Sequence, residues 1–283
     1  MTWKIVVDSA CDIMTLPTDD VAIAYERVPF IIQIGNEMYV DDEGLDVEQL
    51  MRAMDASDSA AASACPSPDR FLEAYKGADN VIAITITSQM SGSHNSAFLA
   101  KKMLEEDYPK TNIHLIDSLS AGGEIDLLVL ELVRLIKQGL TFEEVVDKIT
   151  AYQQHSKLLF ALSKVDNLVK NGRLSKLVGK VVGLLNIRLV GEASPEGTLE
   201  VLEKPRGQKK ALQRIYQELK QHGYAGGRLV IAHQDNAKFC KQLTALIESD
   251  FPKAAISIFP TSGLCSFYAE QGGVMIGYET QKI

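Results

Sequence analysis

Residues 81–93 read VIAITITSQMSGS, and this stretch decides the fold. The apolar run Val81–Ile86 is short and is bounded by turn residues, which predicts a buried strand. A turn rich in hydroxyl side chains follows, and the apolar spacing from Ala97 to Met103 then predicts a helix. A strand, a turn and a helix in this order form the unit of an α/β fold, and the backbone N–H groups at the start of such a helix can bind an anion.

The same alternation runs through the first half of the chain. We expect strands at Lys4–Val7, Val28–Ile34 and Ile113–Ser118. We expect helices at Glu43–Met54, from Pro68 through Tyr75, after Gly123 through Ile136, and at Phe142–Gln153. Thr141 is the expected cap of the last of these helices. The small and polar side chains of residues 56–67 predict an exposed loop.

The second half of the chain shows strands and helices as well. We expect strands at Leu158–Leu162, Arg188–Ala193, Leu199–Leu202, Leu229–Ala232, Ala255–Phe259 and Val274–Tyr278, and helices at Gln208–His222 and Asn236–Ser249. The sequence thus predicts an α/β protein of two lobes. Residues 1–155 form a mainly parallel sheet with helices on both faces, and residues 156–283 form a second α/β lobe.

Composition and charge exclude several classes of protein. Hydrophobic residues make up 46% of the chain and charged residues 23%, which is typical of a globular protein and not of a disordered one. The net charge of −8 provides no overall field that would attract nucleic acid, so we expect no nucleic-acid partner. The N-terminus lacks the apolar core of a signal peptide, and we expect the protein in the cytoplasm. The four cysteines are scattered without metal-binding spacing, so we expect no metal.

Hydroxyl side chains gather at the turns that lead from strands into helices. Each of them can serve as an ordinary helix cap or can help to bind a carboxylate or a phosphate. A serine hydrolase or transferase would pair Ser91 or Ser118 with His94 or His114, but the GxSxG turn of many such enzymes is absent. The glycine-rich loops that hold nucleotide phosphates are also absent, which disfavours a kinase that binds its own nucleotide.

Two further segments have an ordinary and a functional interpretation. Residues 171–176 (NGRLSK) and the basic residues between Lys204 and Lys210 are either solvated surface or a basic edge for a phosphorylated headgroup or an acidic partner. The aliphatic stretch Leu177–Leu185 either lines a long apolar cavity or forms a plain core helix.

Taken together and in order, these segments resemble the DegV family over nearly the whole chain. The segments that carry the resemblance are residues 5–12 (IVVDSACD), 28–30 (VPF), 63–68 (SACPSP), 88–97 (SQMSGSHNSA), 116–118 (IDS) and 171–175 (NGRLS). Residues 63–68 stand where members usually show Thr-Ser-Gln-Pro-Ser, and residues 171–175 look like the family motif Gly-Gly-Arg-Ile-Ser.

The resemblance implies a protein that holds a long-chain fatty acid between its two lobes and that is not itself an enzyme. It implies that the carboxylate is held by hydroxyls and backbone at the interface, here Ser63, Ser91, Gly92, Ser93 and Ser266. Arg173 matches the arginine associated with the headgroup and phosphoryl transfer. A separate ATP-dependent fatty acid kinase then acts on the bound acid, with a possible transient membrane or acyltransferase contact and with no cofactor on this chain.

The sequence departs from the family near its C-terminal end. Many members carry a histidine in a Thr-His-x-Gly-Pro-Gly stretch, whereas residues 262–273 of this chain contain none. Ser266 or Tyr268 could supply the missing hydrogen bond. The departure also keeps open a third function, that of a regulatory or scaffold protein that has the fold without the ligand.

Overall fold

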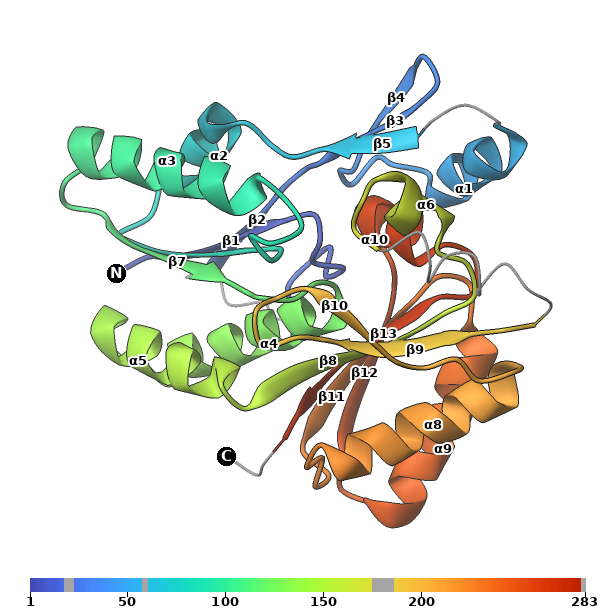
Figure 1. The fold of residues 1–283 in the computed structure, drawn as a ribbon. Coiled ribbons are helices and arrows are strands. Elements are labelled where there is room, and N and C mark those ends of the chain that lie inside the picture. The colour runs from blue at the N-terminus through green and yellow to red at the C-terminus, as the bar shows by residue number, and fades with distance from the viewer. Residues whose placement is uncertain (18–22, 58–60, 175–185, 281–283) are drawn as a thin grey trace.

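The first large sheet is parallel and carries helices on both faces (Figure 1). The computed structural model describes residues 1–17, 23–57, 61–174 and 186–280. The strands of this sheet are β1 (Trp3–Asp8), β2 (Ile23–Val28), β6 (Asn80–Thr85) and β7 (Asn112–Asp117), in the order β2-β1-β6-β7. One face packs against α2 (Pro68–Tyr75) and α3 (Ser93–Asp107), and the other against α4 (Gly123–Lys137) and α5 (Phe142–Gln153). The prediction of a mainly parallel sheet between helices is confirmed.

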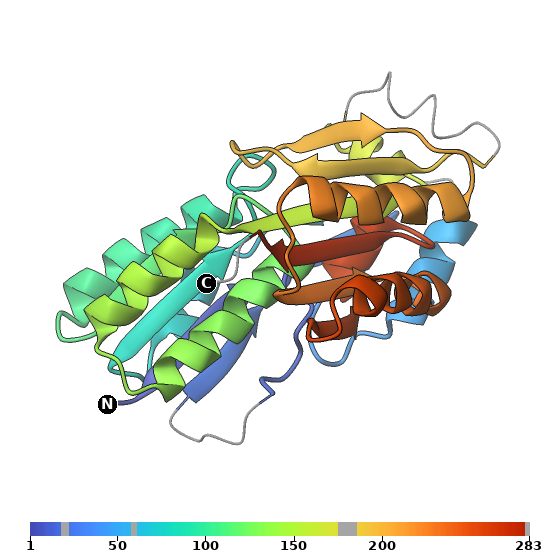
Figure 2. The same cartoon turned by 90° about the horizontal axis from the view of Figure 1, so that it is seen from below.

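The second large sheet is mixed. Its strands are β8 (Ser156–Leu162), β9 (Leu189–Ala193), β10 (Leu199–Glu203), β11 (Arg228–His233), β12 (Ala255–Pro260) and β13 (Val274–Glu279), in the order β10-β9-β8-β13-β11-β12. Only β11 and β12 pair in parallel among the described strands of this sheet. Helices α8 (Gln208–Gln221) and α9 (Ala237–Asp250) cover its outer face (Figure 2). The second lobe is therefore α/β, as the sequence predicts.

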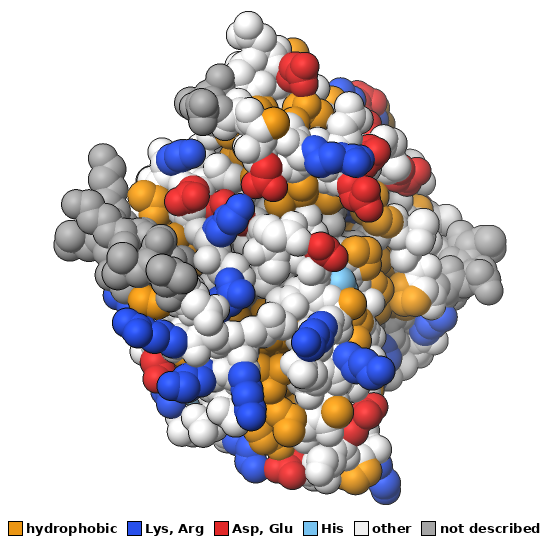
Figure 3. All heavy atoms as spheres, turned by 90° about the vertical axis from the view of Figure 1, so that its right-hand side faces the viewer, with side chains coloured by type: hydrophobic (Ala, Val, Ile, Leu, Met, Phe, Trp, Pro, Cys, Tyr) orange, Lys and Arg blue, Asp and Glu red, His pale blue; other side chains and the backbone are white. Residues whose placement is uncertain are grey.

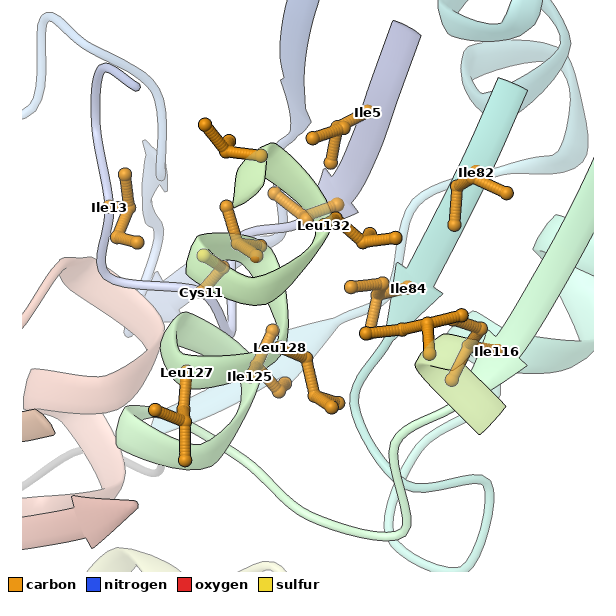
Figure 4. Packing of buried hydrophobic residues seen from close by; sticks show 14 of the residues in the cluster. Ile5, Cys11, Ile13, Ile82, Ile84, Ile116, Ile125, Leu127, Leu128 and Leu132 are labelled. Atoms are coloured by element: carbon orange, nitrogen blue, oxygen red, sulfur yellow. The ribbon is translucent and has the colours of Figure 1, made fainter. Parts of the chain in front are cut away.

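Helix α4 lies between the two large sheets. Leu128 and Leu132 of α4 lie among Ile5, Ile82 and Ile84 of the first sheet (Figure 4). The same helix contacts β13, β11 and β8 of the second sheet. It can approach β13 closely because glycine faces glycine there: a Cβ on Gly277 would overlap with the carbonyl oxygen of Gly123. The two sheets therefore share one helix as part of both cores.

A small antiparallel sheet lies above the C-terminal half of the chain (Figure 1). It consists of β3 (Ile31–Ile34), β4 (Glu37–Val40) and β5 (Ala61–Ala64), in the order β4-β3-β5. Its inner face packs with α1 (Val47–Ala56) and α10 (Gly263–Ala269) through a buried cluster that includes Ile32, Leu50 and Phe267. A short helix, α6 (Asp166–Lys170), lies beside α10.

Several expectations from the sequence are wrong in detail. Residues 56–67 are not a loop throughout, because β5 lies inside them and pairs with β3. The block Val28–Ile34 is not one strand, because β2 ends at Val28 and β3 begins at Ile31, on either side of Pro29. The stretch Leu177–Leu185 lies outside the described residues. The division between residues 155 and 156 stays a prediction, and it falls between the end of α5 and the start of β8.

Candidate functional site

An apolar cavity lies where the end of β1, the end of β6, the second sheet and α10 meet. The residues that line it are Ala10, Ile86, Met90, Ala121, Leu158, Phe160, Leu162, Leu168, Leu199, Leu264, Cys265, Tyr268, Ala269 and Met275. Its volume is about 50 Å³, well below the roughly 300–1,000 Å³ of ordinary ligand pockets. A long ligand therefore requires the lining to move apart. Met90 and Met275 are the unbranched, adaptable side chains of this lining.

Polar groups from distant parts of the chain meet beside this cavity, at Tyr268. The ring of Tyr268 lines the cavity, and its hydroxyl lies 2.8 Å from the hydroxyl of Ser63 on β5. The guanidinium of Arg173 lies 5.2 Å from the centre of the Tyr268 ring. Arg173 is fixed there because its Nε donates to the carbonyl oxygen of Met90 at 3.1 Å. We call Ser63, Tyr268 and Arg173 the polar mouth of the cavity.

The N-terminus of α3 borders the polar mouth. A surface depression is lined by Ser88–Gly92, His94, Asn95, Phe98 and Arg173. Gly92 caps α3 without a side-chain hydrogen bond, and a Cβ on Gly92 would lie 3.4 Å from the Sγ of Cys65, the residue after β5. The first N–H groups of a helix lack partners within the helix and carry a partial positive charge. Together with Arg173 they make this depression suitable for a carboxylate or a phosphoryl group.

The structure brings together most, but not all, of the residues that the resemblance assigns to the carboxylate. Ser63, Ser91, Gly92 and Arg173 lie at the polar mouth or in the adjoining depression. Ser93 and Ser266 are not among the residues that line the cavity or the depression, and both side chains are fully buried and hydrogen bonded elsewhere. The Ser93 hydroxyl donates to Asp8 at 2.6 Å, and the Ser266 hydroxyl lies 2.7 Å from that of Thr261.

Three buried aspartates bind the first residues of α3 and α10, and sequence reasoning missed their role. Asp8 ends β1, Asp12 lies four residues later, and Asp41 follows β4; all three are at most 3% exposed. Burial raises the pKa of Asp8 and of Asp12 to about 6, although several hydrogen bonds oppose the rise. Burial also raises the pKa of Asp41, against the attraction of Arg27. The only signal in the sequence was the polar turn DSACD at residues 8–12, which contains Asp8 and Asp12 but not Asp41.

No nucleophile–base pair joins the residues that a serine hydrolase would need. The Nδ1 of His94 lies 3.1 Å from the hydroxyl of Thr85, and the Ser118 hydroxyl donates to the carbonyl oxygen of Ser120. Among the hydrogen bonds of the described residues, none links Ser91 or Ser118 to His94 or His114. In the described ranges, no cluster of three or more potential ligands could hold a metal ion, and no helix is long and apolar enough to cross a membrane.

The family model described as uncharacterised protein, DegV family, matches residues 2–281. The chain belongs to the DegV family. A DegV domain-containing protein of Streptococcus pyogenes serotype M1 is 61% identical over 279 residues, which are 99% of this chain and 100% of the relative. A DegV domain-containing protein of Streptococcus pneumoniae serotype 4 is 60% identical over the same length.

Solved structures of DegV proteins have the same fold. The fatty acid kinase (Fak) B3 protein of Streptococcus pneumoniae, solved with linoleic acid, matches with a TM-score of 0.98 and 60% identity, over 99% of this chain and 100% of that one. A DegV family protein of Eubacterium eligens, solved with heptadecanoic acid, matches with a TM-score of 0.95 and 35% identity over the same shares. Fatty acids are thus bound in solved structures of two proteins that share the fold of this DegV chain.

Proposed function

We propose that this DegV protein binds a long-chain fatty acid and presents it to a separate ATP-dependent fatty acid kinase. The acyl chain occupies the apolar cavity, and the carboxylate lies at the polar mouth, in contact with Ser63, Ser91 and Tyr268. The observation that carries the proposal is that one residue, Tyr268, belongs both to the cavity wall and to a hydroxyl pair beside an arginine.

The chemistry of the two regions suits the two ends of a fatty acid. Each buried methylene of an acyl chain contributes about 0.8 kcal/mol, so a long chain gains much from an apolar cavity. A carboxylate that leaves water needs several hydrogen-bond donors in return. The hydroxyls of Ser63 and Tyr268, the backbone N–H groups at the start of α3 and the guanidinium of Arg173 can supply them.

In this role the chain is the substrate-carrying subunit, and the kinase supplies the nucleotide. The depression that holds Ser91 and Arg173 is open at the surface, so a second protein can reach a carboxylate placed there. The 60% identity to a protein named as part of a fatty acid kinase supports this division of labour. We place the protein in the cytoplasm, where such a kinase has its ATP.

A transient contact with a membrane or an acyltransferase is a further part of the proposal. Lys and Arg side chains gather over the part of one face where α8 and α9 lie, with hydrophobic surface between them (Figure 3). Lys209 and Lys210 on α8 and Lys238 and Lys241 on α9 are exposed. Such a surface attracts anionic headgroups or an acidic partner more strongly at low salt than at high salt.

Mass spectrometry of an organic extract of the purified, undenatured protein tests the proposal first. A long-chain fatty acid in near-equal molar ratio is the expected result. Binding of added fatty acids must then be saturable at one site per chain. Covalent labelling of one serine by a fluorophosphonate would instead support the hydrolase or transferase alternative.

A second candidate function is that of a regulatory or scaffold protein without a ligand. The small cavity volume of about 50 Å³ favours it, since side chains fill most of the space that an acyl chain would need. A lipid-free extract, together with no saturable binding of added fatty acids by well-folded protein, is the result that would establish it.

A further inference from the structure

Two buried aspartates hold the N-terminus of α10. The two carboxylate oxygens of Asp41 accept the backbone N–H groups of Gly263 and Leu264, each at 2.8 Å. One oxygen of Asp12 accepts both the N–H and the hydroxyl of Ser262, at 2.7 and 3.0 Å. We call Asp12, Asp41 and residues 262–264 the α10 clamp.

The clamp joins segments that are far apart in the sequence and leaves little room between them. Asp41 and Gly263 are separated by 222 positions. A Cβ on Gly263 would lie 2.8 Å from Asp41 and would overlap with the side chain of Leu45. Arg27 places its guanidinium 3.9 Å from Asp41, which supplies the positive charge that this buried carboxylate needs. The first turn of α10 is thus fixed in one position.

Helix α10 is the element that connects the clamp to the proposed ligand site. It has seven residues, too few for a helix to be stable by itself. Leu264, which Asp41 binds, and Tyr268 are four residues apart and so lie on the same side of the helix. Leu264 and Tyr268 both line the cavity, and the Tyr268 hydroxyl meets Ser63. A shift of the first turn would therefore move the Tyr268 hydroxyl away from Ser63.

We propose that Asp41 is a positioning residue for the fatty-acid carboxylate: it holds the first turn of α10 so that the Tyr268 hydroxyl stays beside Ser63. The inference rests on the proposed function, because it requires that a carboxylate binds at the polar mouth. Asp41 itself does not touch the ligand. Its effect on affinity passes through Tyr268.

A double-mutant cycle on the full-length, delipidated protein tests the inference. The four proteins are wild type, Asp41→Asn, Tyr268→Phe and the double variant, and the readout is displacement of a fluorescent fatty acid by oleic acid. Asp41→Asn keeps the size of the side chain but places an amide donor against a backbone donor. We expect each single variant to lose about tenfold in affinity, the equivalent of one hydrogen bond to a charged group. The double variant should bind no more weakly than Tyr268→Phe alone, because Asp41 has no effect once the Tyr268 hydroxyl is gone.

Two further variants separate positioning from a general loss of structure. Asp42→Asn is the matched control: the neighbouring aspartate is exposed, its side chain accepts the N–H of Gly44, and the variant should keep wild-type affinity. Gly263→Ala displaces the first turn of α10 while it keeps the Asp41 carboxylate. It should lower affinity in the wild-type background and have no effect in the Tyr268→Phe background, which a merely destabilised protein would not reproduce.

The outcomes that overturn this inference differ from those that overturn the proposed function. Wild-type affinity in folded Asp41→Asn, or losses that multiply in the double variant, would refute the positioning role while leaving fatty-acid binding intact. If Asp41→Asn does not fold, equal losses for Gly263→Ala in the two Tyr268 backgrounds would refute it as well. No displacement by oleic acid from wild type would instead overturn the proposed function and this inference with it.

Discussion

At Tyr268 a single side chain serves two environments, since its ring borders the apolar cavity and its hydroxyl meets that of Ser63. The residues around it could be predicted from the sequence to different degrees. Ser63, Ser91 and Arg173 were predicted from motifs that resemble the DegV family; the structure places them at the polar mouth or in the adjoining depression, and their roles stay predictions. Asp41 could not be predicted, because no local pattern links it to a helix 222 positions away. Ser93 belongs to one of these motifs too, but its hydroxyl donates a hydrogen bond to Asp8.

Removal of a hydroxyl at the mouth should weaken binding without unfolding the protein. We expect Ser63→Ala and Ser91→Ala each to cost roughly 1.5–3 kcal/mol of fatty-acid binding, because each removes one charge-assisted hydrogen bond. Displacement of a fluorescent fatty acid measures the loss. Ser249→Ala, an exposed serine on α9, is the control and should bind as wild type does. Unchanged affinity in both variants would show that the carboxylate lies elsewhere.

Glu124 should make the stability of the protein depend on pH. Burial raises its pKa from 4.5 to about 7, although the Ser156 hydroxyl opposes the rise. Because the folded chain then binds this proton more tightly than the unfolded chain, the stabilisation is fully present below about pH 4.5 and is lost as the pH rises through about 7. Relative to Glu124→Gln, which stays neutral, wild type should lose on the order of 3 kcal/mol of unfolding free energy between pH 4.5 and 8.

Urea unfolding of both proteins at several pH values measures this difference. Glu248→Gln is the control, because Glu248 is exposed on α9 and its substitution should leave the pH dependence of wild type in place. A gap between wild type and Glu124→Gln that is the same at pH 5 and pH 8 would contradict the prediction.

At the scale of elements, the sequence predicts best what local chemistry decides. The helix Phe142–Gln153 was predicted with its observed bounds, with Thr141 as its cap, and in the structure Thr141 and Glu144 form a capping box at its start. Strand β5 was missed because alanine and serine have no strong preference for strands, and its pairing with β3 decides its structure. Helix α10 was missed for a related reason, since two aspartates from the other half of the chain hold its first turn.

The contact between α4 and β13 should not tolerate a side chain. In Gly277→Ala the new methyl group would overlap with the backbone of Gly123, and a backbone cannot move aside as a flexible side chain can. We expect a loss of stability of about 1–3 kcal/mol or more, measured by urea unfolding. Gly44→Ala is the control, since its methyl group would meet only the exposed side chain of Asp42. A loss for Gly277→Ala no larger than for Gly44→Ala would mean that the two elements can separate without cost.

At the scale of the whole molecule, ligand binding and stability are coupled. A fatty acid that binds only the folded chain should raise the unfolding free energy by about 2.7 kcal/mol at a ligand concentration one hundred times the dissociation constant. Octanoic acid should stabilise less than stearic acid at equal concentration, because each buried methylene contributes about 0.8 kcal/mol. Thermal unfolding of delipidated protein with each acid measures the order. Octadecanol, which has the chain without the carboxylate, is the control for the contribution of the polar mouth.

The glycine contact between α4 and β13 also bears on how the protein is made. Helix α4 ends at Lys137, but one of its packing partners, β13, begins only at Val274 and lies inside its sheet. During synthesis the apolar surface of α4 that will face β13 stays uncovered until about half of the chain has followed it. The nascent chain is therefore exposed to aggregation until β13 has been made, and a chaperone that shields α4 until then would protect it best.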